Sequence, residues 1–347
     1  MFDNLNIEGY RGIAKTELSQ FSRINLFFGK NNCGKSSILE ALFLLTGPAN
    51  PTLPLLMNQL RGISRHTLQT MALEFYQPNI HNRIFIKSEG NEARQLTIQL
   101  VKRENPNINL KDIVPGETSS VNYSYGFSTT FRSKGHDKDY KSEILINPEN
   151  NTQASQNIAP DYQELIVARF LSSRLSMSID QSDYGQIVKN KDEEKIFDLM
   201  RIIEPRLIDI QLVGNEFLVN LGGETRLPIN VMGDGFLKIF NLILDIHYSR
   251  DGILIVDELD NGIHYSVMPL LWKAINEACV RLNVQLFAST HSLDLIKGLV
   301  SAFKDEDYVN SSIAAYKLIR RPNDEIASVR YTIGELSYSV NQNIEMR

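Results

Sequence analysis

A glycine-rich segment near the N-terminus contains the residues with the clearest chemistry, Gly29-Lys30-Asn31-Asn32-Cys33-Gly34-Lys35-Ser36. It matches the pattern G-x-x-x-x-G-K-[ST] and lies between a predicted strand and a predicted helix, as a phosphate-binding loop (P-loop) requires. Glycines let successive backbone N–H groups surround the α- and β-phosphates of a nucleotide, and the dipole of the following helix adds attraction. We expect Lys35 to reach the β- and γ-phosphates and Ser36 to ligate Mg²⁺. The predicted nucleotide contacts are Gly29, Asn31, Asn32, Cys33, Gly34, Lys35, Ser36 and Ser37.

Two adjacent acids, Asp257 and Glu258, follow the apolar run Ile253-Leu254-Ile255-Val256. In parallel α/β sheets ligands bind at the carboxyl ends of strands, where the P-loop also belongs. Asp257 is expected to hold the Mg²⁺ and Glu258 to act as the general base that polarises the attacking water. Taken alone, a strand that ends in two acids is more often a solvated terminus. Its combination with a P-loop favours the catalytic interpretation.

A third predicted strand, residues 284–288, has an apolar end, and Ser289-Thr290-His291-Ser292 follow it. A single histidine at a strand end is most often structural or exposed. Beside the two other motifs, His291 is predicted to donate a hydrogen bond to the γ-phosphate from a neighbouring strand. The predicted catalytic residues are therefore Lys35, Glu258 and His291.

Strands and helices alternate at both ends of the chain. Residues 1–47 predict a strand, the P-loop and a helix that stops at Gly47-Pro48, and residues 206–347 predict further alternating elements, with strands near 208–212 and 217–220 among them. The middle, residues 48–205, is more polar and predicts strands around 83–87, 95–102 and 121–131. We expect an α/β fold: a mostly parallel sheet flanked by helices, an antiparallel β subdomain and a helical insertion.

Composition limits the classes of function. The 347 residues are 42% hydrophobic and 22% charged, which is ordinary for a globular protein. No apolar run approaches the roughly 18 residues of a membrane-spanning helix. Without such a run no membrane partner is expected. Two cysteines are too few for a disulfide framework or a four-ligand zinc site, which fits a cytoplasmic location. The net charge of −5 opposes nucleic acid unless a local basic patch exists.

The order of these motifs resembles the ABC-class ATPases of the RecF/SMC/OLD-like branch. The Asn-Asn-x-Gly-Lys-Ser form of the P-loop and the string Asp257-Glu258-Leu259-Asp260-Asn261-Gly262-Ile263-His264 look like the compact ATPases of that branch found in bacterial defence operons. The resemblance implies ATP and Mg²⁺ as ligands, and it places Arg11 of Tyr10-Arg11-Gly12 near the nucleotide. No glutamine is assigned to the family's Q-loop, for which the candidates are Gln69, Gln95 and Gln99.

The segment Met232-Gly233-Asp234-Gly235-Phe236 looks like the signature loop of the same family. In the family this loop contacts the γ-phosphate of ATP bound to the other subunit, so Gly233, Asp234 and Gly235 are expected to do so here, with Asp234 as a helix cap. Gly233 occupies the place where many relatives have a serine, and His264 that of the usual D-loop aspartate. The alternative for the loop is a plain N-capped turn.

The resemblance implies a homodimer or higher homo-oligomer that shares its ATP sites. OLD-type relatives carry a nuclease domain after the ATPase core, and the sequence shows no acid clusters for one. We therefore expect a separately encoded effector, a nuclease or toxin, regulated or assembled in anti-phage defence. The alternatives are a RecF-like DNA-binding ATPase in DNA repair and an ATP-binding scaffold with little turnover.

For nucleic acid, the candidate surface is the alternating Tyr123, Tyr125 and Phe127 with nearby basic residues, although packing onto the core is the favoured interpretation.

Overall fold

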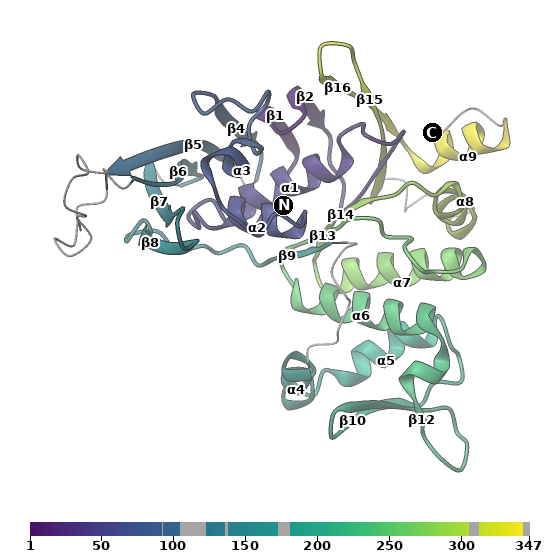
Figure 1. Cartoon of the computed structure of the whole chain (residues 1–347). Coiled ribbons are helices and arrows are strands. Elements are labelled where there is room, and N and C mark those ends of the chain that lie inside the picture. The colour runs from purple at the N-terminus through teal and green to yellow at the C-terminus, as the bar shows by residue number, and fades with distance from the viewer. Residues whose placement is uncertain (92, 105–122, 136–137, 173–180, 305–311, 343–347) are drawn as a thin grey trace.

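A single mixed sheet dominates the computed structural model of the chain (Figure 1), which describes residues 1–91, 93–104, 123–135, 138–172, 181–304 and 312–342. Within these residues thirteen strands form the sheet in the order β8-β7-β6-β5-β4-β1-β2-β16-β15-β3-β14-β13-β9. Helices pack on both of its faces, as the sequence predicted.

The parallel core of this sheet brings together the two ends of the chain. Its five adjacent parallel strands are β9 (Ala168–Leu171), β13 (Ile253–Val256), β14 (Gln285–Ser289), β3 (Ile24–Phe28) and β15 (Ile313–Arg320). Every residue of β3, β13 and β14 is buried, which fits the apolar run of β13 and the mostly apolar sequences of β3 and β14. The sequence assigned residues 168–171 to the middle region, but their backbone pairs with β13 and so completes this core.

The predicted antiparallel strands continue the same sheet. β16 pairs with β2 in parallel, and β2, β1, β4, β5, β6, β7 and β8 then follow as antiparallel neighbours. Their bounds are β1 (Asn4–Tyr10), β2 (Ile13–Ser19), β4 (Arg83–Ser88), β5 (Arg94–Glu104), β6 (Tyr123–Ser133), β7 (Tyr140–Asn147), β8 (Thr152–Asn157) and β16 (Glu325–Tyr331).

Alternate side chains of the parallel strands enter two different cores. Ile253 and Ile255 pack with helix α1 (Lys35–Thr46) and with the antiparallel strands. Leu254 and Val256 pack on the opposite face with α6 (Asp234–Tyr248), α7 (Met268–Arg281) and α8 (Leu293–Ala302). Figure 1 shows α1 and α6 on opposite sides of β13 and β14. The indole Nε1 of the fully buried Trp272 donates to the carbonyl of Leu295 at 3.0 Å and ties α7 to α8.

The strands predicted near residues 208–212 and 217–220 lie outside the main sheet. β10 (Asp209–Val213), β11 (Glu216–Asn220) and β12 (Leu227–Pro228) form a separate three-stranded antiparallel sheet. It packs near α4 (Gln181–Asn190) and α5 (Glu193–Arg201), where the Tyr184 hydroxyl donates to the Ile210 carbonyl at 2.6 Å. The remaining helices are α2 (Leu53–Leu60), α3 (Leu68–Ala72), α9 (Ile333–Asn341) and the 3₁₀ turns η1 (Ile229–Met232) and η2 (Tyr265–Val267).

The aromatic residues of β6 divide between packing and contact with a lysine. Phe127 is fully buried and stacks on Phe75, with ring centroids 6.4 Å apart. The ammonium of Lys102 lies 3.4 Å from the ring centroid of Tyr123. Phe127 therefore belongs to the core, as the favoured interpretation had it. In the parts of the chain that the structure describes, no helix has both the length and the apolar character to cross a membrane.

Candidate functional site

The P-loop, the acidic pair and the Ser-Thr-His segment meet at the carboxyl ends of β3, β13 and β14. The Ser36 hydroxyl donates to Asp257 Oδ1 at 3.1 Å, and the Ser289 hydroxyl donates to the same oxygen at 2.6 Å. The first of these contacts joins residues 221 positions apart in the chain. The parallel register of the three strands produces it, since Val256 lies beside Ala288 and Ser289 beside Phe27.

The backbone of the P-loop has the conformation that a phosphate cradle needs. Gly29 and Gly34 have φ of 143° and 95°, and Asn32 has φ of 65°. A Cβ on Gly34 would lie 2.2 Å from Ile326 Cδ1, so this position requires glycine for space as well as conformation. Helix α1 begins at Lys35, directly after Gly34, so the free N–H groups of its first turn lie at the P-loop and can bind phosphate.

Lys35 is folded back over the loop. Its ammonium donates to the carbonyls of Gly29 at 2.9 Å and Lys30 at 3.0 Å, and it lies 3.6 Å from Cys33 Sγ. Burial lowers the pKa of Lys35, and the nearby Asp257 and Glu258 oppose this effect. The ammonium thus has carbonyl partners that it can exchange for phosphate oxygens.

The two acids have different environments. Asp257 is half-buried and accepts hydroxyl hydrogen bonds from both Ser36 and Ser289. Glu258 is half-buried with φ of 58°, a left-handed conformation that is rare for residues other than glycine. Its backbone N–H donates to Ser289 Oγ at 2.9 Å. Asp257 therefore turns its carboxylate toward the P-loop, while the chain bends at Glu258.

His291 is exposed at the end of β14. Desolvation lowers its pKa, the ammonium of Lys35 lowers it further, and the carboxylates of Glu258, Asp260 and Asp257 act in the opposite direction. The histidine thus lies within electrostatic reach of the P-loop lysine and the acids, and its contact with the γ-phosphate remains a prediction. A lowered pKa favours the neutral ring, which keeps one N–H that can donate.

The predicted signature loop begins α6, on the face of the parallel strands opposite α1. Gly233 has φ of 88° and is the N-cap residue, with no side-chain capping hydrogen bond. The prediction of Asp234 as the cap is wrong, because the helix already begins at Asp234, which contributes its charge to the first turn. Gly233 and Asp234 are exposed, and nothing lies within 4 Å of a Cβ built on Gly233 or Gly235. In the residues described, no hydrogen bond joins this loop to the P-loop of the same chain.

Arg11 is held in a buried ionic network instead of an open site. Its Nε donates to Glu40 at 2.7 Å and its Nη2 to Glu74 at 3.0 Å, and its side chain is 7% exposed. Arg61 bonds the other oxygen of Glu40 at 2.8 Å and reaches the Ser37 hydroxyl at 3.3 Å. Since Glu40 and Ser37 lie on α1, the network anchors the helix that follows the P-loop. The expected contact of Arg11 with nucleotide remains a prediction.

Glu74 in this network predicts a pH dependence of stability. Burial raises the pKa of Glu74 to about 7, against the lowering effect of Arg11, and Glu74 Oε2 has no hydrogen-bond partner among the described residues. The folded protein holds this proton more tightly than the unfolded chain does. Its free energy of unfolding therefore falls as pH rises from the unfolded pKa near 4.5 to the folded value, by at most about 3 kcal/mol. We expect the melting temperature of Glu74→Gln to fall less between pH 5 and pH 8 than that of the wild type. Glu277→Gln, at a half-buried glutamate on α7, serves as control, and parallel curves for Glu74→Gln and the wild type would contradict this explanation.

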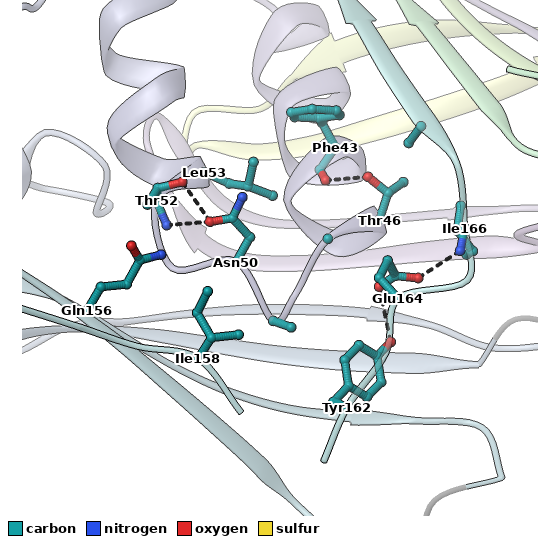
Figure 2. Close-up of a pocket in the computed structure, with 13 residues that line it drawn as sticks. Phe43, Thr46, Asn50, Thr52, Leu53, Gln156, Ile158, Tyr162, Glu164 and Ile166 are labelled. Carbon is teal, nitrogen blue, oxygen red and sulfur yellow. Dashed lines mark hydrogen bonds between the residues drawn. The ribbon is translucent and has the colours of Figure 1, made fainter. Parts of the chain in front are cut away.

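Two cavities lie near the P-loop helix. One of about 490 Å³ lies beside the P-loop and is lined by Lys30, Asn31, Asn32, Cys33 and residues 317–320 of β15. The other, of about 510 Å³, lies at the C-terminal end of α1, where Phe43, Leu53 and Ile166 are among its lining residues (Figure 2). In the second, Glu164 accepts from the Ile166 N–H at 2.9 Å and the Tyr162 hydroxyl at 3.1 Å. Of these two, the first includes predicted nucleotide contacts and the second does not.

Sequence reasoning missed the hydroxyls that hold the acids. Ser289 bonds Asp257, and Thr290 Oγ1 donates to Asp260 Oδ1 at 2.5 Å. The available signal was the pair of hydroxyl residues directly after an apolar strand. The three glutamines considered for the Q-loop are elsewhere, Gln69 in α3 and Gln95 and Gln99 in β5.

Comparisons with known proteins show which family the chain resembles. The family model described as "AAA domain, putative AbiEii toxin, Type IV TA system" matches residues 24–297. The chain is 22% identical over 340 residues to an ATP/GTP phosphatase of Helicobacter pylori, in an alignment that covers 90% of this chain and 91% of that protein. Over 41 residues, 12% of this chain and 11% of the relative, it is 51% identical to the DNA replication and repair protein RecF of a Shewanella species.

Among solved structures, an SMC head bound to the C-winged helix domain of ScpA is similar with a TM-score of 0.49 and 12% identity, over 95% of this chain and 97% of that one. The family model spans both the P-loop and the Ser-Thr-His segment. The chain therefore belongs to this AAA-domain family and is a P-loop ATPase.

Proposed function

We propose that the protein hydrolyses ATP with Mg²⁺ at the carboxyl ends of β3, β13 and β14. The observation that carries this proposal is the hydrogen bond between the Ser36 hydroxyl and the Asp257 carboxylate. A hydroxyl and a carboxylate in contact beside a P-loop are the oxygen donors that Mg²⁺ prefers. When bound, the cation neutralises charge on the phosphates.

The other residues of the site bind the triphosphate or accept the proton of the attacking water. Backbone N–H groups of the P-loop and the Lys35 ammonium bind the triphosphate, and His291 donates to the γ-phosphate. Glu258 accepts a proton from the water as the water oxygen bonds to the γ-phosphorus and the bond to the β-phosphate oxygen breaks. The products are ADP and inorganic phosphate. The phosphatase activity named for the Helicobacter pylori relative supports this reaction class.

We further propose that two copies complete each site. The exposed Gly233 and the half-buried Gly235 lie at the start of a helix on the face opposite α1, and no hydrogen bond of the described residues links them to their own P-loop. Backbone N–H groups at a helix start bind anions, so this loop fits the γ-phosphate held by a second copy. ATP would then hold the dimer together and hydrolysis would release it, which gives a two-state switch.

A mixing experiment tests the shared site. Lys35→Ala damages the P-loop, and Gly235→Asp places a carboxylate in the signature loop, where the chain leaves open space. We expect each variant alone to be inactive, whereas a 1:1 mixture recovers up to about a quarter of wild-type turnover, because half of the dimers are mixed and each has one intact site. Phosphate release measures the outcome. A mixture no more active than its components would contradict sharing between chains, and full activity of Gly235→Asp alone would remove the loop from the site.

We propose that residues 1–47 and 206–347 form the ATPase core and residues 48–205 an insertion, with β9 as its contribution to the core.

The switch would regulate or assemble a separately encoded effector, with anti-phage defence as the setting. A DNA-repair role is not favoured over this one, because the similarity to RecF covers 12% of the chain. The basic residues of the insertion also have acidic neighbours, Arg132 with Asp139, Lys138 with Asp161 and Arg103 with Glu143, which weakens the case for a nucleic-acid surface.

A further inference from the structure

Ser289, the last residue of β14, connects the two acids of the site. Its side chain is fully buried. The hydroxyl donates to Asp257 Oδ1 at 2.6 Å and accepts the backbone N–H of Glu258 at 2.9 Å. One hydroxyl group thus bonds the carboxylate expected to hold Mg²⁺ and the backbone of the expected general base.

The two hydrogen bonds of the Ser289 hydroxyl stabilise the backbone of Glu258 and the orientation of the Asp257 carboxylate. Glu258 has a left-handed φ of 58°, which costs free energy unless surrounding contacts maintain it. The Ser289 backbone adds a further contact, since its carbonyl accepts the N–H of Leu259 at 3.0 Å. Asp257 Oδ1 accepts a hydrogen bond from the Ser289 hydroxyl at 2.6 Å and another from the Ser36 hydroxyl at 3.1 Å. The two serines together fix the direction of that carboxylate.

We infer that Ser289 is a positioning residue for ATP hydrolysis, one that orients Asp257 toward the metal and holds Glu258 in line with the attacking water. The inference rests on the proposed function. Outer-shell groups that hydrogen-bond metal ligands typically change metal affinity or activity by about 10- to 100-fold when they are removed. Ser289 acts through Asp257 and Glu258 and need not touch ATP.

The test compares Ser289→Ala with Ser249→Ala, which removes another fully buried serine hydroxyl, at the C-terminal end of α6. We expect Ser289→Ala to lower kcat about 10- to 100-fold and to raise the Mg²⁺ concentration needed for half-maximal turnover. ATP affinity measured in EDTA should equal that of the wild type. Ser249→Ala should leave kcat, the Mg²⁺ requirement and ATP affinity in EDTA unchanged.

A second measurement separates this inference from the proposed reaction. In the Glu258→Gln background, where turnover is blocked, we expect Ser289→Ala to reduce the gain in ATP affinity that Mg²⁺ provides. An unchanged gain together with wild-type kcat would overturn the role of Ser289 while leaving hydrolysis intact. An equal loss of ATP affinity with and without Mg²⁺, accompanied by a lower melting temperature, would overturn it in favour of a purely structural role. Absence of hydrolysis by the wild type would refute the proposed function itself.

Discussion

Replacement of Lys35 by alanine is expected to abolish ATP binding. The ammonium is the cation of the P-loop itself, and its present partners are two backbone carbonyls of the same loop. Loss of a charge-assisted contact to phosphate in a partly buried site is expected to weaken binding at least about 100-fold. The variant should still fold, because alanine removes a buried ammonium whose charge burial disfavours.

Isothermal titration with ATP and Mg²⁺ measures this effect. Lys273→Ala, which removes an exposed lysine on α7, provides the control and should bind as the wild type does. If Lys35→Ala bound ATP with nearly wild-type affinity while remaining folded, residues 29–36 would not be the nucleotide cradle.

Replacement of Glu258 by glutamine is expected to separate binding from turnover. Glutamine preserves the shape of the side chain and the backbone bond to Ser289, but it cannot accept the proton of the water. Removal of a general base lowers turnover by about 100- to 10,000-fold. ATP affinity should remain, and an ATP-bound dimer should accumulate because hydrolysis no longer releases it.

Phosphate release and light scattering during gel filtration measure the two consequences. Glu277→Gln, an exchange of a half-buried glutamate on α7, should match the wild type in both. Equal hydrolysis by Glu258→Gln and the wild type would show that another group receives the proton. A monomeric Glu258→Gln protein at saturating ATP would contradict the proposed switch.

The sequence predicted the residues of the site that belong to contiguous motifs. Lys35 and Ser36 lie in one glycine-rich loop, and Asp257 and His291 closely follow apolar strands, so each could be assigned from local pattern. Their meeting also follows from a general rule, since parallel strands direct their carboxyl ends to one edge of a sheet.

Contacts between distant segments could not be predicted in this way. Arg11 bonds Glu74, 63 positions away, and no local pattern marks that contact. The strand at 209–213 has ordinary strand character, but its partner is the adjacent β11 and not the main sheet. Strand propensity describes a segment, whereas sheet membership depends on which other segments pack beside it.

Ser289 illustrates the same limit within the site. Its type and place after an apolar run were visible, yet its two hydrogen bonds depend on the register between β13 and β14. A shift of one residue in that register would turn its side chain to the opposite face.

The most direct test of the account is a crystal structure of the Glu258→Gln variant grown with ATP and Mg²⁺. We predict a triphosphate on the backbone of residues 29–36, the cation between the Ser36 hydroxyl and the Asp257 carboxylate, and Gly233 to Gly235 of a second copy against the γ-phosphate. An empty P-loop, or a nucleotide bound with the side chains of positions 257 and 258 directed away from its terminal phosphate, would contradict it.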